Sequence, residues 1–94
     1  MEALKPFRAK IDELDEQILS LLGERYNVVR QVAAIKSEHG IASYLPDRVE
    51  EVKERCADIG EKHGLDRELV KTIYTLIIAK AVAMEDIKIK ADQA

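Results

Sequence analysis

An arginine interrupts an apolar stripe in the first third of the chain, and its position indicates an anion-binding pocket. Apolar residues recur there with the 3–4 spacing of one face of a long helix, namely Leu4, Phe7, Ile11, Leu14, Ile18, Leu21, Val28, Val32 and Ile35. Arg25 takes the next place in this rhythm after Leu21. A guanidinium on a buried face costs free energy unless an anion meets it. Lys36 follows Arg25 within about 20° of helical phase, so both cations can face one pocket for a small anion.

A third cation, Arg8, cannot reach that pocket from its own chain. It precedes Arg25 by about 25 Å along the helix axis, and it lies about 100° away in helical phase. If Arg8 binds the same ligand, a partner subunit must therefore contribute it.

The chain must fold into helices to bring these cations together, and three helices are predicted. The first runs from about residue 4 to Glu38, and Gly40 follows it as the C′ residue. A loop carrying Ser43 and Tyr44 leads to a second helix, which begins at Pro46. Its apolar residues are Val49, Val52, Cys56 and Ile59.

The second predicted helix can loosen at Gly60 and ends at Gly64. Asp66 is the expected N-cap of the third helix, and the segment after Lys90 is expected to fray. The apolar residues of this helix are Leu69, Val70, Ile73, Leu76, Ile77, Ile78, Ala81, Met84 and Ile87. Residues 1–94 are thus predicted to form a single all-α domain.

The length of the first helix predicts a partner. A helix of about 34 residues spans about 50 Å, whereas a compact globule of this chain length has a radius of gyration of about 12 Å. The helix therefore overhangs any monomeric core, and its apolar stripe continues along the overhang. A homodimer that interlocks the long helices is the simplest structure that covers it.

Composition excludes several classes of function. The net charge of -3 argues against a nucleic-acid partner. No apolar run has the length of a membrane span, and no signal peptide is recognisable. The single cysteine, Cys56, cannot form an internal disulfide, so a cytoplasmic location is expected. No metal-ligand cluster, phosphate loop or Ser-His-Asp set is present, so we expect no metal, no cofactor and no covalent catalysis.

Each of these charged residues also has an ordinary interpretation when taken alone. Arg25 can bury its stem and keep its head in water, Lys36 can complement a helix dipole, and Glu85 can be a solvated acid. A non-catalytic helical dimerisation module would explain the stripe and the overhang. It would leave Arg25 within the stripe unexplained.

Five short motifs follow one another along the chain. They are FRAKIDELD at residues 7–15, LLGER at 21–25, VAAIK at 32–36, PDRV at 46–49 and HGLD at 63–66. In this order and spacing they resemble the all-helical chorismate mutase family, the intertwined-dimer type, over nearly the whole chain. The resemblance implies a homodimer whose sites rearrange chorismate to prephenate.

The resemblance also implies roles for individual residues. The ligand would be a cyclohexadiene dicarboxylate that carries an enolpyruvyl ether. Arginines hold its two carboxylates, and Arg8, Arg25 and Arg48 occupy the matching positions. Lys36 matches the lysine placed against the ether oxygen. The implied apolar wall consists of Val32, Ile78 and Ala81. A Claisen rearrangement needs only a compact substrate conformer and a cation at the ether oxygen.

Two positions depart from the commonest family pattern. Glu85 stands where many members have a glutamine that donates to the ether oxygen, so it must be protonated there or serve another role. Val49 stands where many members have a glutamate near the ring hydroxyl. The PDRV step resembles isochorismate pyruvate lyases, and residues 84–87 resemble mutases of 4-amino-4-deoxychorismate. Both activities therefore stay open as alternatives.

Overall fold

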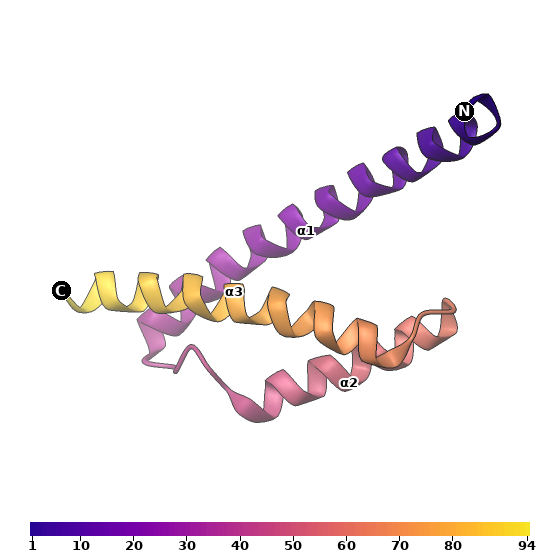
Figure 1. The fold of residues 1–94 in the computed structure, drawn as a ribbon. Coiled ribbons are helices and arrows are strands. Elements are labelled where there is room, and N and C mark those ends of the chain that lie inside the picture. Colours follow the sequence, from indigo (N-terminus) through magenta and orange to yellow (C-terminus); the bar gives the residue numbers. More distant parts are fainter.

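Three α-helices make up almost the whole molecule (Figure 1). The computed structural model describes residues 1–94, in which a 3-10 turn (Glu2–Leu4) precedes α1 (Lys5–His39), α2 (Pro46–Lys62) and α3 (Arg67–Gln93). α3 is the central element, because it packs against both α1 and α2, while the backbones of α1 and α2 do not approach each other closely. The prediction of an all-α fold with a long first helix is confirmed.

The helix ends follow the predicted signals. Gly40 has a φ of 66° and its N–H bonds to the carbonyl of Lys36, which closes α1. Gly64 has a φ of 77° just after α2. Only glycine adopts such angles at no steric cost. The Asp66 carboxylate accepts a hydrogen bond of 3.0 Å from the N–H of Leu69, so the predicted N-cap of α3 is confirmed.

Gly60 does not loosen α2, contrary to the prediction. The helix continues through it to Lys62, and Gly60 is buried against α3. A Cβ atom at this position would lie 2.6 Å from Cγ2 of Val70. The absent side chain therefore lets α2 and α3 approach closely, and its role is packing rather than flexibility.

The expected fraying after Lys90 is also wrong, because α3 extends to Gln93. Asp92 fixes this end by accepting hydrogen bonds of 2.6 Å from Ser37 Oγ and 3.1 Å from Lys88 Nζ. These two donors lower the pKa of the Asp92 carboxyl. The last turn of α3 is thus tied to the last turns of α1.

The core of the single chain is small and lies between α2 and α3. Val52, Cys56 and Val70 are buried there, with Tyr74 and Ile78 packed against them. α1 is attached to α3 through Tyr26, whose hydroxyl donates a 3.0 Å hydrogen bond to the carbonyl of Ile77. Only 8 of 94 residues are buried, too few for burial within one chain to account for an ordinary folding stability.

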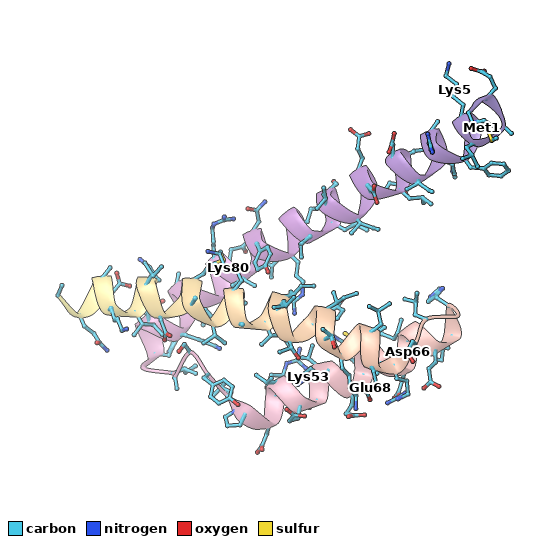
Figure 2. The ribbon with its side chains drawn as sticks, in the orientation of Figure 1. Met1, Lys5, Lys53, Asp66, Glu68 and Lys80 are labelled. Carbon is cyan, nitrogen blue, oxygen red and sulfur yellow. The ribbon has the colours of Figure 1, made fainter.

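The predicted apolar stripe of α1 is not covered within the chain. Its nine apolar residues are 39% to 67% exposed. The half of α1 that carries Leu4 to Leu21 projects away from α2 and α3, and Figure 2 shows Met1 and Lys5 at its free end. The molecule measures 57 × 24 × 15 Å, with a radius of gyration of 16.9 Å. The overhang predicted from helix length is therefore present.

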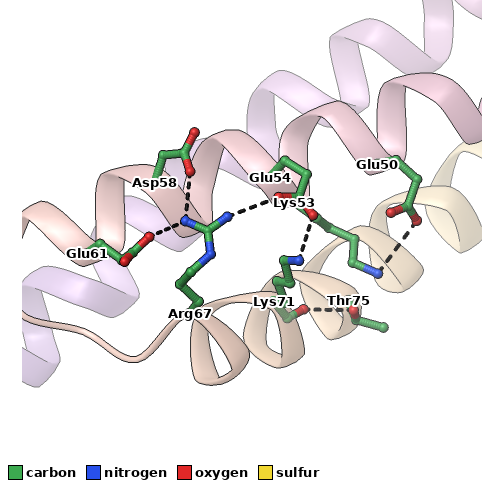
Figure 3. Close-up of polar contacts among 8 residues, drawn as sticks. All are labelled: Glu50, Lys53, Glu54, Asp58, Glu61, Arg67, Lys71 and Thr75. Carbon is green, nitrogen blue, oxygen red and sulfur yellow. Dashed lines mark hydrogen bonds and ion pairs between the residues drawn. The ribbon is translucent and has the colours of Figure 1, made fainter.

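A network of ion pairs fixes α2 against α3 on the outer surface (Figure 3). Arg67 contacts Glu54 at 3.0 Å, Asp58 at 2.7 Å and also Glu61, while Lys71 Nζ lies 2.6 Å from Glu54. The hydrogen bond and charge of Lys71 lower the pKa of Glu54. Single exposed pairs contribute little, but one guanidinium that contacts three acids links the start of α3 to α2 at three positions.

No helix of the structure combines the length and the apolar character that crossing a membrane would require.

Candidate functional site

An open cavity of about 440 Å³ is lined by all three helices and by the connection between α1 and α2. α3 forms one wall, the C-terminal half of α1 forms a second, and α2 forms a third. Its lining residues are Arg25, Val28, Val29, Val32, Lys36, Ser43, Leu45, Arg48, Val49, Val52, Arg55, Ile78, Ala81, Val82 and Glu85. Most of the site residues predicted from the sequence therefore line this cavity.

Arg25 faces the cavity without an acidic partner. Its side chain is half-buried, and its guanidinium carbon lies 5.7 Å from the centre of the Tyr74 ring, within cation–π range. None of the ion pairs in the chain includes Arg25. Its charge is therefore available to a bound anion, and the aromatic ring restricts its direction.

Lys36 is held inside the cavity by two oxygen atoms. Its Nζ donates a hydrogen bond of 3.0 Å to the carbonyl of Ser43 and lies 2.7 Å from Glu85 Oε1. The Lys36 and Glu85 side chains are only 15% and 7% exposed. Glu85 Oε1 is covered and accepts no hydrogen bond of normal geometry, so charge holds this pair together. A buried pair of this kind is costly to break, because either partner left alone is an uncompensated charge.

α2 contributes two arginines from one face. Arg48 is largely exposed and forms an ion pair with Glu51 one turn further along the helix. Arg55 follows Arg48 by two helical turns and also lines the cavity. The sequence reasoning missed Arg55, although the seven-residue spacing from Arg48 places both side chains on the same side of a helix.

Apolar side chains surround these charges. Val32, Ile78 and Ala81, which the resemblance implies as an apolar wall, line the cavity together with Val49, and Ala81 is 7% exposed. Apolar walls lower the local dielectric constant and strengthen every charge interaction inside. Four cations and one acid line this cavity, a formal charge of 4 − 1 = +3, so it suits a partly apolar ligand with more than one negative charge.

Arg8 is not brought to this cavity. It lies on the projecting half of α1, and the continuous helix separates it from Arg25 by about 25 Å. The structure thus joins Arg25, Lys36, Arg48 and Glu85 in one place and leaves Arg8 outside.

No group of three or more His, Cys, Asp and Glu side chains is arranged to hold a metal ion. Cys56 is free but buried between α2 and α3. The charged and apolar lining of the cavity can bind and orient an anion and stabilise negative charge.

Comparison with known proteins adds an independent observation. Residues 7–86 match the family described as chorismate mutase type II. The chain is 34% identical over 84 residues to 4-amino-4-deoxychorismate mutase of Streptomyces venezuelae, covering 89% of this chain and 82% of that protein. It is 32% identical over 85 residues to chorismate mutase of Methanocaldococcus jannaschii, covering 90% and 86%. It is 36% identical over 88 residues to the bifunctional chorismate mutase/prephenate dehydratase of Aquifex aeolicus, of which it spans 24%.

Proposed function

Since this chain belongs to the chorismate mutase type II family of isomerases, we propose that it catalyses the Claisen rearrangement of chorismate to prephenate. The observation that carries this proposal is the cavity of about 440 Å³, with cationic side chains from two helices set in an apolar wall. Its size and charge suit a cyclic dicarboxylate, and Lys36 is held within it.

The reaction needs no nucleophile from the protein. The ether C–O bond of the substrate breaks while a new C–C bond forms, and the electrons move within the substrate. Negative charge develops on the ether oxygen in the transition state. The Nζ of Lys36, already oriented by Ser43 and Glu85, would stabilise that charge without reorganisation. Holding the substrate in its compact conformer would supply the rest of the acceleration.

The arginines would bind the two carboxylates. A guanidinium matches a carboxylate with two parallel hydrogen bonds, which an ammonium cannot reproduce. Arg25 is available from α1 because no acid of the chain pairs with it, and Arg48 can exchange its exposed contact with Glu51 for the ligand. Arg8 of the partner subunit would complete the set of arginines that binds the two carboxylates.

We propose that the active form is a homodimer. The single chain exposes 7156 Å², whereas a compact protein of this mass exposes about 5,500 Å². An excess of roughly 1,700 Å² per chain matches the area buried in obligate homodimers. The uncovered stripe from Leu4 to Leu21 supplies the apolar surface, and its overhang can carry Arg8 to a second subunit.

For Glu85 the ion pair with Lys36 supports a role other than that of a protonated donor. A carboxylate 2.7 Å from Nζ fixes the ammonium and remains compatible with a cation at the ether oxygen. The cost is that a negative charge sits near the oxygen that becomes negative in the transition state. This arrangement would limit the rate with chorismate.

The second candidate reaction is the rearrangement of 4-amino-4-deoxychorismate. Glu85 lines the cavity and can attract an ammonium group on the substrate ring, and Val49 offers no acceptor for a ring hydroxyl. The Streptomyces venezuelae relative bears the name of that activity. An isochorismate pyruvate lyase is a third candidate and rests on the PDRV step alone.

A non-catalytic dimerisation module would use the α1 stripe and need no cavity. It gives no reason for the half-buried, acid-free position of Arg25. We also propose a cytoplasmic location, because the only cysteine is free and thiols persist in reducing compartments.

A ligand that mimics the transition state tests the proposed function. A stable bicyclic dicarboxylate should raise the melting temperature of the wild type by mass action. Arg25→Ala should abolish this increase while leaving the dimer intact in light scattering. A wild type that does not respond would contradict a mutase site, and loss of the fold in Arg25→Ala would favour a structural role for the arginine.

A further inference from the structure

The connection between α1 and α2 carries one of the two oxygens that hold Lys36. Ser43 lies at the middle of this connection, and its carbonyl accepts the hydrogen bond of 3.0 Å from Lys36 Nζ. Unlike Glu85, which sits on a helix, this carbonyl belongs to a segment without regular structure. Such segments are the most mobile parts of a fold. The direction of the Lys36 ammonium therefore depends on what fixes Ser43.

A side-chain hydrogen bond fixes Ser43 to α3. The Ser43 hydroxyl donates to Asp86 Oδ1, and both side chains are partly buried. Hydrogen bonds to an ionised carboxylate are about twice as strong as neutral ones. Asp86 follows Glu85 directly on α3, so adjacent acids hold the ammonium and the residue that orients it.

We infer that Ser43 and Asp86 form a clamp that positions the ammonium of Lys36 for the reaction. The lysine stem has four carbons and rotates freely unless its end is held. Displacing a charge by about 1 Å from the reacting atoms can cost about a hundredfold in rate. Ser43 and Asp86 act through Lys36 and are positioning residues, and their effect on catalysis rests on the function proposed above.

The chain contains a matched control for this clamp. Ser37 on α1 donates to Asp92 on α3 at 2.6 Å, so the chain has a second serine–aspartate hydrogen bond to α3, which is exposed. Neither Ser37 nor Asp92 lines the cavity. A purely structural role predicts similar effects for Ser43→Ala and Ser37→Ala, whereas the clamp predicts an effect on kcat for Ser43→Ala alone.

Steady-state kinetics of four variants test the clamp. Ser43→Ala should lower kcat about tenfold and change KM little, because the substrate carboxylates are bound elsewhere. Ser37→Ala should leave kcat unchanged. Ser43→Thr keeps the hydroxyl and should retain most of the wild-type kcat. Asp86→Asn keeps only a neutral acceptor, whose hydrogen bond is weaker, so its kcat should lie between those of the wild type and Ser43→Ala. Equal kcat values for Ser43→Ala and Ser37→Ala would overturn the inference, as would a Ser43→Thr variant as slow as Ser43→Ala.

A second readout is independent of turnover. Lysine ammonium groups held by protein oxygens exchange slowly with water and give ¹H–¹⁵N signals, and Lys36→Ala identifies the signal of Lys36. Ser43→Ala should abolish this signal at an unchanged melting temperature, and Ser37→Ala should preserve it. Persistence of the signal in Ser43→Ala would overturn the clamp. A wild type that shows the signal but converts no substrate would contradict the proposed function instead.

Discussion

At the scale of residues, the site depends on how its cations are paired. Arg25 faces an aromatic ring instead of an acid, and Lys36 shares its charge with a buried carboxylate. Arg25 therefore remains free to bind a ligand carboxylate. The carboxylate of Glu85 fixes the ammonium of Lys36, but it also weakens the positive potential that the ammonium exerts on the substrate. The identity of residue 85 therefore connects rate with substrate choice.

Exchanging Glu85 for glutamine should separate the two leading substrates. Glu85→Gln removes the negative charge near the ether oxygen and supplies a neutral N–H donor, so kcat/KM for chorismate should rise about tenfold. For 4-amino-4-deoxychorismate the loss of attraction to the ring ammonium should lower kcat/KM by about the same factor. Glu50→Gln is the control, since Glu50 pairs with Lys53 at 3.8 Å on the surface. A shift of both substrates in one direction would contradict this role of Glu85.

Helical phase was sufficient to predict several residues of the site. Arg25 and Lys36 were paired correctly because eleven residues return almost to the same side of a helix. The position of Arg55 in the cavity could have been predicted in the same way, from its seven-residue spacing from Arg48, but the sequence analysis did not include it. The contacts of Ser43 were not predictable, because a loop conformation depends on tertiary contacts rather than on a period in the sequence.

At the scale of elements, α3 is the scaffold that positions the other two helices. It ties α1 through Tyr26 and Ser37, and it meets α2 through the Val52, Cys56 and Val70 core. The close approach of Gly60 to Val70 and the ion pairs of Arg67 both join the C-terminal part of α2 to the first turns of α3. The width of the cavity follows from the spacing of α2 and α3.

A methyl group at Gly60 should weaken the α2–α3 contact. In Gly60→Ala the new Cβ would lie 2.6 Å from Cγ2 of the buried Val70, and such overpacking costs about 1–3 kcal/mol. Gly23→Ala is the control, because no atom lies within 4 Å of its Cβ position. Chemical denaturation should show a loss of stability for Gly60→Ala only. Combining Gly60→Ala with Val70→Ala should recover part of it, and strict additivity of the two effects would contradict the contact.

Acid should weaken the same pair of helices through Glu54. The hydrogen bond and charge of Lys71 hold the Glu54 pKa below its usual value of 4.5 in the folded state. The resulting stabilisation is complete above that pH and is lost as the pH falls through the folded-state pKa. Melting temperatures recorded in acid should therefore fall less steeply for Glu54→Gln than for the wild type. Glu50→Gln serves as the neighbouring control, and identical acid profiles for Glu54→Gln and the wild type would refute this contribution.

Helix boundaries were predictable where a local signal sets them. Gly40, Gly64 and Asp66 end or begin helices through their own backbone or side chain. Gly60 and the last residues of α3 were misjudged, since their conformation depends on Val70 and Ser37, which are distant in sequence. A glycine that permits close approach cannot be distinguished from one that loosens a helix until its neighbour is known.

At the scale of the whole molecule, the single chain is incomplete in two respects. The apolar stripe of α1 is uncovered, and Arg8 lies about 25 Å along the helix from Arg25, outside the cavity. A homodimer with interlocked α1 helices would cover the apolar stripe and bring Arg8 of each chain to the cavity of the other. The overhang was predictable from helix length alone, whereas the surface that would cover it in the proposed dimer depends on a second chain.

Mixing two inactive variants tests whether a partner supplies Arg8. Arg8→Ala and Arg25→Ala should each be nearly inactive, and refolding them together should restore about one quarter of the wild-type activity. Half of the dimers are then mixed, and each mixed dimer has one intact site built from both chains. If Arg8 acted within its own subunit, every site would carry a defect and the mixture would stay inactive.

The central claim is that the cavity around Lys36 is a mutase site, and a product-resolved assay tests it most directly. Purified protein would receive chorismate, isochorismate and 4-amino-4-deoxychorismate separately, with chromatography and mass spectrometry of the products. We predict rearrangement of chorismate to prephenate, and loss of this activity in a folded Arg25→Ala variant. Turnover of none of the three substrates, or equal turnover by Arg25→Ala, would contradict the assignment of this cavity.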